Sequence, residues 1–344
     1  MASNDSLERM AQAAIEGATL SSTVRLPSLF AEATMKHLAL VFSLLLVSCT
    51  SDGSGSRRNL PIIDVHLHAE PVDWFGTPAP EWVPAGLAPA KTDDELMRDT
   101  LLALERNNVV TAFASGPIEF VKRWQTASPE RIVPSLWPEN AGPPGTGATL
   151  DVLEAEFRMG NLGAMAEVGW QYSGISPADP EAEPYLALAE RLDLPVGIHM
   201  GLGPPGVSYK EGSKYRAALG NPLLLEEALI RHPTVRVWIM HAGWPLLSET
   251  IALMHAHPQV YADVAVINWY LPRPEFHEYL RRLVQAGLGK RLMFGSDQMV
   301  WPGAISLAIE GIESADFLSV EQKRDIFYNN AVQFFRLEGR LPKH

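Results

Sequence analysis

The chain is poor in three features that would direct it to other classes of protein. Cys49 is its only cysteine, so neither a disulfide nor a thiolate metal site can form within it. It has no basic excess, because 40 acidic residues outnumber 28 basic ones and the net charge is −12. This balance argues against a nucleic-acid partner and favours a small-molecule substrate. Its N-terminal apolar run, Leu38 to Val47, is shorter than the roughly 20 residues of a membrane-spanning helix.

The segment before residue 60 has the layout of a secretory signal. Met35-Lys36-His37 precedes the apolar run, and the run ends in Leu46-Val47-Ser48-Cys49, which resembles a bacterial lipoprotein lipobox. Cleavage before Cys49 would leave a lipidated cysteine, so we expect a membrane-anchored lipoprotein of the cell envelope that faces the periplasm or the exterior. The alternative is a helix that happens to end in Ser-Cys.

These signals divide the chain into four parts. Residues 1–34 are an extension, either disordered or upstream of a true start at Met35, and residues 35–49 are the signal peptide. Residues 50–59 have the composition of a flexible tether, and residues 60–344 form one folded domain.

From Leu60 onward, strand and helix patterns alternate, which is typical of a parallel sheet covered by helices. Eight short apolar runs predict an α/β fold with a single (β/α)8 barrel. A last helix, from about 319 to 337, carries enough apolar surface to pack on the outside of the barrel. The eight predicted strands are Ile62–His66, Val109–Ala114, Ile132–Trp137, Ala164–Val168, Val196–His199, Val235–His241, Val260–Val266 and Leu292–Phe294.

Start signals place three further helices. Thr92 precedes three acidic residues, which is the pattern of a capped helix N-terminus. Proline at the start of 222–231 and of 245–255 predicts two more helices. The loops expected at the carboxyl ends of the strands are long and rich in Pro, Gly and Trp, as in barrels that build a substrate pocket there: 70–90, 139–149, 201–220 and 298–303.

Polar residues close several of the strands. His66 and His68 lie two apart in IIDVHLH, so strand alternation sends both imidazoles to the same side. His199, His241 and Asp297 follow the fifth, sixth and eighth runs. Because the carboxyl ends of barrel strands meet at one face, we expect these side chains to come together. Imidazoles with a carboxylate suit zinc, iron or manganese, although Asp297 alone also fits a helix cap or turn.

From Leu60 to Leu337 the chain resembles the amidohydrolase superfamily, in particular its amidohydrolase-related branch of metal-dependent hydrolases and decarboxylases. The resemblance implies a metal-dependent TIM barrel in which His66, His68, His199 and Asp297 belong to the metal site. We expect one or two divalent ions, zinc ahead of manganese or iron. The matching elements are DVHLH at 64–68, GIHMG, MHAGWP, the YADV strand, GSD at 295–297 and Asn330-Ala331.

Glu167 in AMAEVG decides between two forms of that site. By the resemblance, this position holds a bridging carboxylated lysine, a bridging glutamate or no ligand. As a bridge, Glu167 would join two ions, with His199 and His241 on the second. In a single-ion site, Glu167 would orient a ligand histidine and His241 would face the substrate as acid, base or electrophile. The candidate metal residues are therefore His66, His68, Glu167, His199, His241 and Asp297.

The activity expected from this set is hydrolysis of an amide, ester or lactone by a metal-activated water. Asp297 would accept the proton of the water and deliver it to the leaving group, and His241 is the second catalytic candidate. Two alternatives stay open. One is a metal-dependent nonoxidative decarboxylase, and the other is a non-catalytic metal- or ligand-binding lipoprotein. Beyond the substrate, we expect contact with a membrane through the lipid on Cys49, and a homodimer is compatible with the sequence.

Overall fold

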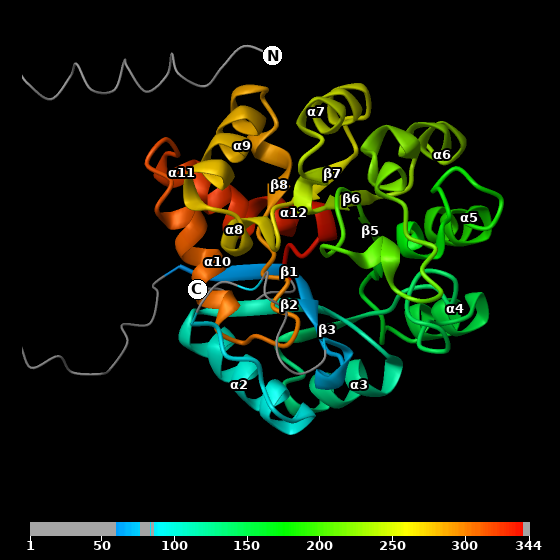
Figure 1. Ribbon diagram of the computed structural model, residues 1–344, viewed down its shortest axis with the longest axis horizontal. Coiled ribbons are helices and arrows are strands. Elements are labelled where there is room, and N and C mark those ends of the chain that lie inside the picture. The colour runs from blue at the N-terminus through cyan, green and yellow to red at the C-terminus, as the bar shows by residue number, and fades with distance from the viewer. Residues whose placement is uncertain (1–59, 76–82, 84–85, 340–344) are drawn as a thin grey trace, which may run out of the picture. The chain divides into compact units, whose positions relative to one another are not determined.

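Strands and helices alternate along the chain in the computed structural model, which describes residues 60–75, 83 and 86–339 (Figure 1). All eight predicted runs form strands, with ends that differ from the predicted ends by a few residues. The strands are β1 (Ile62–His68), β2 (Val109–Ser115), β3 (Ile132–Ser135), β4 (Met165–Val168), β5 (Val196–His199), β6 (Val237–Met240), β7 (Tyr261–Asp263) and β8 (Leu292–Met293).

The eight strands close into a parallel barrel. Regular pairing joins β1 to β3 in one group and β4 to β8 in a second. The groups meet where Ser135 pairs with Ala164, between β3 and β4. On the other side, the Val65 amide donates to the Phe294 carbonyl at 3.0 Å, which joins β1 to the end of β8. The predicted (β/α)8 barrel is therefore confirmed.

Helices follow most of the strands and surround the barrel in Figure 1. Their apolar faces are buried against the strands because a parallel sheet must be covered on its outer face. The longer ones are α2 (Asp93–Arg106), α3 (Ile118–Ala127), α4 (Leu150–Arg158), α5 (Glu183–Leu192), α7 (Leu247–Ala256), α9 (Arg273–Gln285) and α10 (Ala304–Glu313).

Helix α2 begins where its cap residue predicts. The Thr92 hydroxyl accepts a hydrogen bond from the Glu95 amide at 3.1 Å and satisfies one free donor of the first turn. Leu96, Thr100 and Leu104 are fully buried, and their spacing of four residues puts them on one face. That face fixes how α2 packs on the barrel.

The two segments that begin with proline are shorter as α-helices than the sequence predicts. Residues 222–231 divide into a 3₁₀ turn, η6 (Pro222–Leu225), and α6 (Glu226–Arg231). The Asn221 side chain caps the turn by accepting from the Leu223 amide at 3.0 Å. In the second segment, α7 begins at Leu247 rather than at Pro245.

The C-terminal segment is interrupted. It consists of α11 (Val320–Arg324), a π-helical turn η9 (Asp325–Asn329) and α12 (Asn330–Phe335). Asn330 donates its side-chain amide hydrogens to the carbonyls of Gly289, at 2.9 Å, and Leu292, at 2.7 Å. The last helix is thereby tied to the start of β8.

Helix α12 does not lie on the outer face of the barrel, where the sequence predicts the last helix, but covers the barrel end opposite the polar strand ends, because its Phe334 and Phe335 fit among the apolar residues inside the barrel. Its Phe334 and Phe335 contact Trp238 of β6, with ring centroids 5.6 Å and 5.3 Å apart. Phe335 also stacks on Phe113 of β2 at 3.9 Å. These rings join the apolar residues inside the barrel in one buried cluster. Figure 1 shows α12 at the centre of the ring of strands.

Among the helices that the structure describes, none is long and apolar enough to span a membrane. The predicted extension 1–34, signal peptide 35–49 with Cys49, and tether 50–59 lie outside the described residues. So do residues 76–82 and 84–85 of the predicted loop 70–90.

Candidate metal centre

The six candidate residues come together at the carboxyl ends of β1, β4, β5, β6 and β8. Their ligand atoms form three overlapping groups that could hold a metal ion: His66, His68 and Glu167; Glu167, His199 and His241; and His66, His241 and Asp297. The four histidines and Asp297 are buried, and the Glu167 side chain is 15% exposed, so an opening reaches the middle of the cluster.

The end of β1 presents two histidines to the barrel axis. An extra residue in β1 between Asp64 and Leu67, relative to β2, re-aims the strand just before the site. The Asp64 carboxylate accepts from the amides of His66 and Ser296, both at 3.0 Å, and so holds β1 against the segment that follows β8. Asp64 therefore positions the strand end that carries His66 without facing the centre itself.

Four donor atoms converge around His68, and we call this group site A: His66 Nε2, His68 Nε2, Glu167 Oε2 and Asp297 Oδ1. His68 Nε2 lies 3.3 Å from His66 Nε2, 3.2 Å from Glu167 Oε2 and 3.0 Å from Asp297 Oδ1. His66 Nε2 lies 3.4 Å from Glu167 Oε2 and 3.8 Å from Asp297 Oδ1. Donors bonded to one ion at about 2.0 to 2.2 Å are separated by about 3 to 3.5 Å, so the set has the size of a coordination shell.

Three donor atoms form a second group, site B: Glu167 Oε1, His199 Nδ1 and His241 Nε2. Glu167 Oε1 lies 2.6 Å from His199 Nδ1 and 3.3 Å from His241 Nε2, and the two nitrogens are 3.2 Å apart. The two oxygens of Glu167 thus face different pairs of histidines. This is the arrangement expected of a carboxylate that bridges two ions.

In His66 and His241, the ring nitrogen that faces away from the centre has a partner that fixes the tautomer. His66 Nδ1 lies 3.2 Å from Asp263 Oδ2, and His241 Nδ1 lies 3.2 Å from the Ala265 carbonyl. A carboxylate and a carbonyl only accept, so both Nδ1 atoms carry the hydrogen. The Nε2 atoms of neutral His66 and His241 therefore turn lone pairs toward the centre.

Those lone pairs provide the test of whether a metal fits. Inside sites A and B, lone pairs of imidazoles face carboxylate oxygens, and such buried acceptors repel one another unless a proton or a cation lies between them. A divalent ion satisfies all the donors of a site at once, and the mixture of nitrogen and oxygen donors suits zinc, manganese or iron. The residues present therefore fit a divalent metal ion.

The pKa values of these residues reflect their burial and their close contacts with one another. Burial lowers the pKa of His66, but Asp297, Asp263 and Glu167 outweigh it and hold that pKa well above its ordinary value. The Glu167 carboxyl shows the reverse: burial raises its pKa, but His66 and the close contacts with His199 and His241 hold it well below the usual range. Burial lowers the pKa of His199, which favours the neutral form that can bind a metal.

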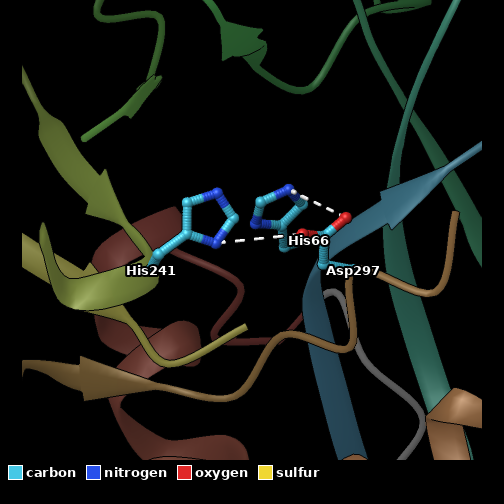
Figure 2. Close-up of side chains that lie close together, drawn as sticks. All are labelled: His66, His241 and Asp297. Atoms are coloured by element: carbon cyan, nitrogen blue, oxygen red, sulfur yellow. Dashed lines mark ion pairs between the residues drawn. The ribbon is translucent and has the colours of Figure 1, made fainter. Parts of the chain in front are cut away.

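Two of the site residues occupy strained backbone positions. His241 has φ 57° and Asp297 has φ 47°, in the left-handed region that non-glycine residues seldom adopt. Such positions cost about 1 to 3 kcal/mol each and cluster at functional sites. Figure 2 shows the result: His241 and Asp297 point inward beside His66, with Asp297 oxygens 3.8 Å from nitrogens of both rings.

Sequence reasoning missed three residues that touch the ligand set. Asp263, fully buried, also accepts from the amides of His241 and Ala265 and from the Trp238 indole. Glu70 Oε2 lies 3.5 Å from His68 Nδ1. Tyr172 Oη lies 3.3 Å from His199 Nε2, and desolvation and the Glu167 carboxylate raise the pKa of its hydroxyl well above the ordinary value. The signals were available for Asp263, which ends the YADV strand, and for Glu70, which continues the alternation of His66 and His68.

Comparisons with known proteins agree with this fold. The family described as Amidohydrolase matches residues 63–337, which span the whole barrel. Members of this family bind divalent metals, and its enzymes act on small molecules. No curated protein matches the chain significantly.

Solved structures share the architecture at low identity. An uncharacterised TIM-barrel protein from Bordetella bronchiseptica has a TM-score of 0.58 and 18% identity over 82% of this chain and 100% of its own. A probable 2-pyrone-4,6-dicarboxylic acid hydrolase from Acinetobacter baumannii, with citric acid bound, has a TM-score of 0.55 and 15% identity over 80% and 100%. A dihydroxybenzoic acid decarboxylase from Polaromonas sp. JS666, with bound manganese and the inhibitor 2-nitroresorcinol, has a TM-score of 0.53 and 12% identity over 81% and 97%.

With four histidines, a glutamate and an aspartate gathered at the strand ends of a (β/α)8 barrel, and a family match over nearly all of that barrel, the chain belongs to the amidohydrolase family.

Proposed function

We propose that this protein is a hydrolase of a small organic substrate and that it uses two divalent ions, zinc ahead of manganese or iron, held in sites A and B. The observation that carries the proposal is the orientation of Glu167. Its Oε2 lies among His66 and His68, while its Oε1 lies among His199 and His241. One carboxylate that faces two pairs of imidazoles has little use in a site for a single ion.

The chemistry of the centre is divided between the ions and Asp297. When bound, divalent ions lower the pKa of a water and polarise the carbonyl oxygen of an amide, ester or lactone. Asp297 places Oδ1 3.0 Å from His68 Nε2 within site A, whereas its Oδ2 is directed toward His241. When an ion is bound, Oδ1 would be its ligand, and Oδ2 could take a proton from the attacking water and pass it to the leaving group.

A second candidate is nonoxidative decarboxylation at a single ion in site A. The contact that favours it is the approach of His241 Nδ1 to Asp297 Oδ2 at 3.8 Å, because a carboxylate at that separation stabilises a protonated imidazole, which could donate its proton to the substrate if His241 is not a ligand. Against it, the nearer partner of His241 Nδ1 is the Ala265 carbonyl at 3.2 Å, which turns Nε2 into site B.

The metal content of the full-length protein tests the two-ion centre. Wild type should bind two ions per chain by elemental mass spectrometry, and Glu167→Gln should bind one or none, because an amide cannot bridge as a carboxylate does. A matched control is Glu156→Gln, since Glu156 is also buried but bonds Lys122 and Asn161 away from the site. One ion in both wild type and Glu167→Gln would favour the single-ion decarboxylase.

We also propose, from the lipobox-like sequence before Cys49, that the enzyme is a lipoprotein of the cell envelope. The Cys49→Ser variant should then move from the membrane fraction to the soluble fraction of expressing cells. Equal distribution of the two proteins would rule out the anchor.

A further inference from the structure

The hydroxyl of Tyr172 lies at the edge of site B. Tyr172 belongs to a 3₁₀ turn, η3 (Trp170–Ser173), directly after β4. Its ring meets the His199 ring edge-on, with centroids 4.9 Å apart, and its Oη lies 3.3 Å from His199 Nε2. Tyr172 is partly exposed, whereas His199 is buried. A molecule that approaches site B therefore meets this phenol.

The surrounding loop holds the phenol in place. The Tyr172 ring packs on Tyr215 at 5.3 Å, and the Tyr215 oxygen accepts from the Gly203 amide at 2.7 Å. A Cβ on Gly203 would lie 2.9 Å from Tyr172 Oη and 2.8 Å from Tyr215 Cε2. Because both distances are shorter than real Cβ contacts, a side chain at position 203 would displace one of the two tyrosine rings.

The hydrogen-bond direction between Tyr172 and His199 depends on site B, so this step rests on the proposed function. His199 uses Nδ1 toward site B, at 2.6 Å from Glu167 Oε1. Once Nδ1 is a ligand, the hydrogen of a neutral imidazole must sit on Nε2. Nε2 then donates to the Tyr172 oxygen, and the phenolic hydrogen is free to point elsewhere. Among the described residues, the Tyr172 hydroxyl has no second hydrogen-bond partner.

We propose that Tyr172 is a catalytic residue whose hydroxyl donates a hydrogen bond to the substrate oxygen that gains negative charge. For an ester, lactone or amide, that atom is the carbonyl oxygen. A fixed donor aimed at a developing oxyanion stabilises the transition state more than the ground state. The hydrogen bond from His199 strengthens the donor, because accepting a hydrogen bond at its oxygen polarises the phenolic O–H. His199 would thus bind the ion of site B through Nδ1 and polarise the Tyr172 hydroxyl through Nε2.

Binding of two anionic probes to the cobalt-loaded full-length protein tests this role without any knowledge of the substrate. Methylphosphonate offers tetrahedral oxygens that resemble the developing oxyanion, whereas linear azide has no tetrahedral group to place an oxygen at the position of that oxyanion. By visible absorption titration, Tyr172→Phe should weaken methylphosphonate binding roughly 10- to 100-fold, the range for a hydrogen bond to a charged group. Azide affinity and cobalt content should stay at wild-type values. Tyr209→Phe, which removes a phenol hydroxyl from a side chain that is 93% exposed, should leave both affinities unchanged.

Three results would overturn the proposal, and they are distinguishable. If Tyr172→Phe binds methylphosphonate as wild type does, or if both probes are weakened equally, Tyr172 is not a specific hydrogen-bond donor to the oxyanion. If Tyr172→Phe loses cobalt, the role of Tyr172 is to position His199 for metal binding, and not to contact the substrate. A wild-type protein that takes up no cobalt contradicts the metal centre itself, and the role of Tyr172 falls with it.

Discussion

Asp263 links three parts of the centre although it contacts no ligand atom of sites A and B directly. Its carboxylate accepts hydrogen bonds from His66 Nδ1, the Trp238 indole and the His241 amide. Metal-binding histidines depend on such partners for ring orientation and basicity. We therefore assign it to the positioning of His66 on one side and of the strained His241 backbone on the other.

Asp263→Asn should weaken metal binding by about 10- to 100-fold, because an amide cannot accept at both of its terminal atoms and the His66 tautomer is no longer imposed. Competition with a chromophoric chelator measures this affinity. Asp325→Asn is the control, since Asp325 is also buried but pairs with Lys290 at 2.6 Å, outside the site. Wild-type affinity in Asp263→Asn would show that the contact with His66 is incidental.

For single residues, the sequence predicted which side chains lie close together, but not the direction in which each side chain points. His66, His68, His199, His241 and Asp297 could be found because each follows an apolar run, and barrel geometry brings strand ends together. The division of Glu167 between two pairs of histidines depends on its rotamer, which neighbours from other strands determine. Tyr172 was one of many loop aromatics, and no local pattern distinguishes it from the rest.

The last helix is the element that closes the barrel end away from the metal centre. Phe335 contacts Phe113 and Trp238, which belong to strands β2 and β6. Since its ring is buried in the cluster inside the barrel, its removal leaves a cavity that the surrounding strands cannot easily fill.

Phe335→Ala should destabilise the protein by about 3 to 5 kcal/mol, the usual cost of deleting a buried aromatic ring. Chemical denaturation followed by tryptophan fluorescence measures the change. Val320→Ala is the control, because Val320 is 80% exposed. The metal content of Phe335→Ala should remain at the wild-type value, since the ring lies at the opposite end of the barrel. A loss below about 1 kcal/mol would mean that α12 does not support the barrel.

Elements were predicted more accurately in type than in length. Each of the eight apolar runs is a strand because parallel strands are buried on both faces and need continuous hydrophobic sequence. The end of the chain was predicted as one helix, whereas a π-helical turn separates α11 from α12. That turn lets Asn330 reach the carbonyls of Gly289 and Leu292, at the start of β8, a tertiary contact that no local propensity encodes.

Over the whole molecule, the proposed ions couple catalysis to stability. Sites A and B draw ligands from five strands, so the ions bind the folded barrel far better than the unfolded chain. Ligands of this kind stabilise the native state by about 2.7 kcal/mol when present at a hundredfold excess over their Kd.

Removal of metal with a chelator should therefore lower Tm by about 3 to 10 °C in differential scanning calorimetry, and zinc should restore it. A His66→Ala, His68→Ala double variant should show a smaller fall in Tm with chelator than wild type, because site A is lost and only site B is left to bind an ion. An unchanged wild-type Tm after complete removal of metal would contradict the coupling.

The most direct test of the two-ion centre is anomalous diffraction from crystals of the full-length protein loaded with zinc. The account predicts two zinc peaks about 3.5 to 4 Å apart. One should lie within bonding distance of His66, His68, Asp297 and Glu167, and the other within bonding distance of His199, His241 and the second oxygen of Glu167. A single peak among His66, His68 and Asp297, with His241 unligated, would contradict the bridging role of Glu167 and the hydrolase built on it.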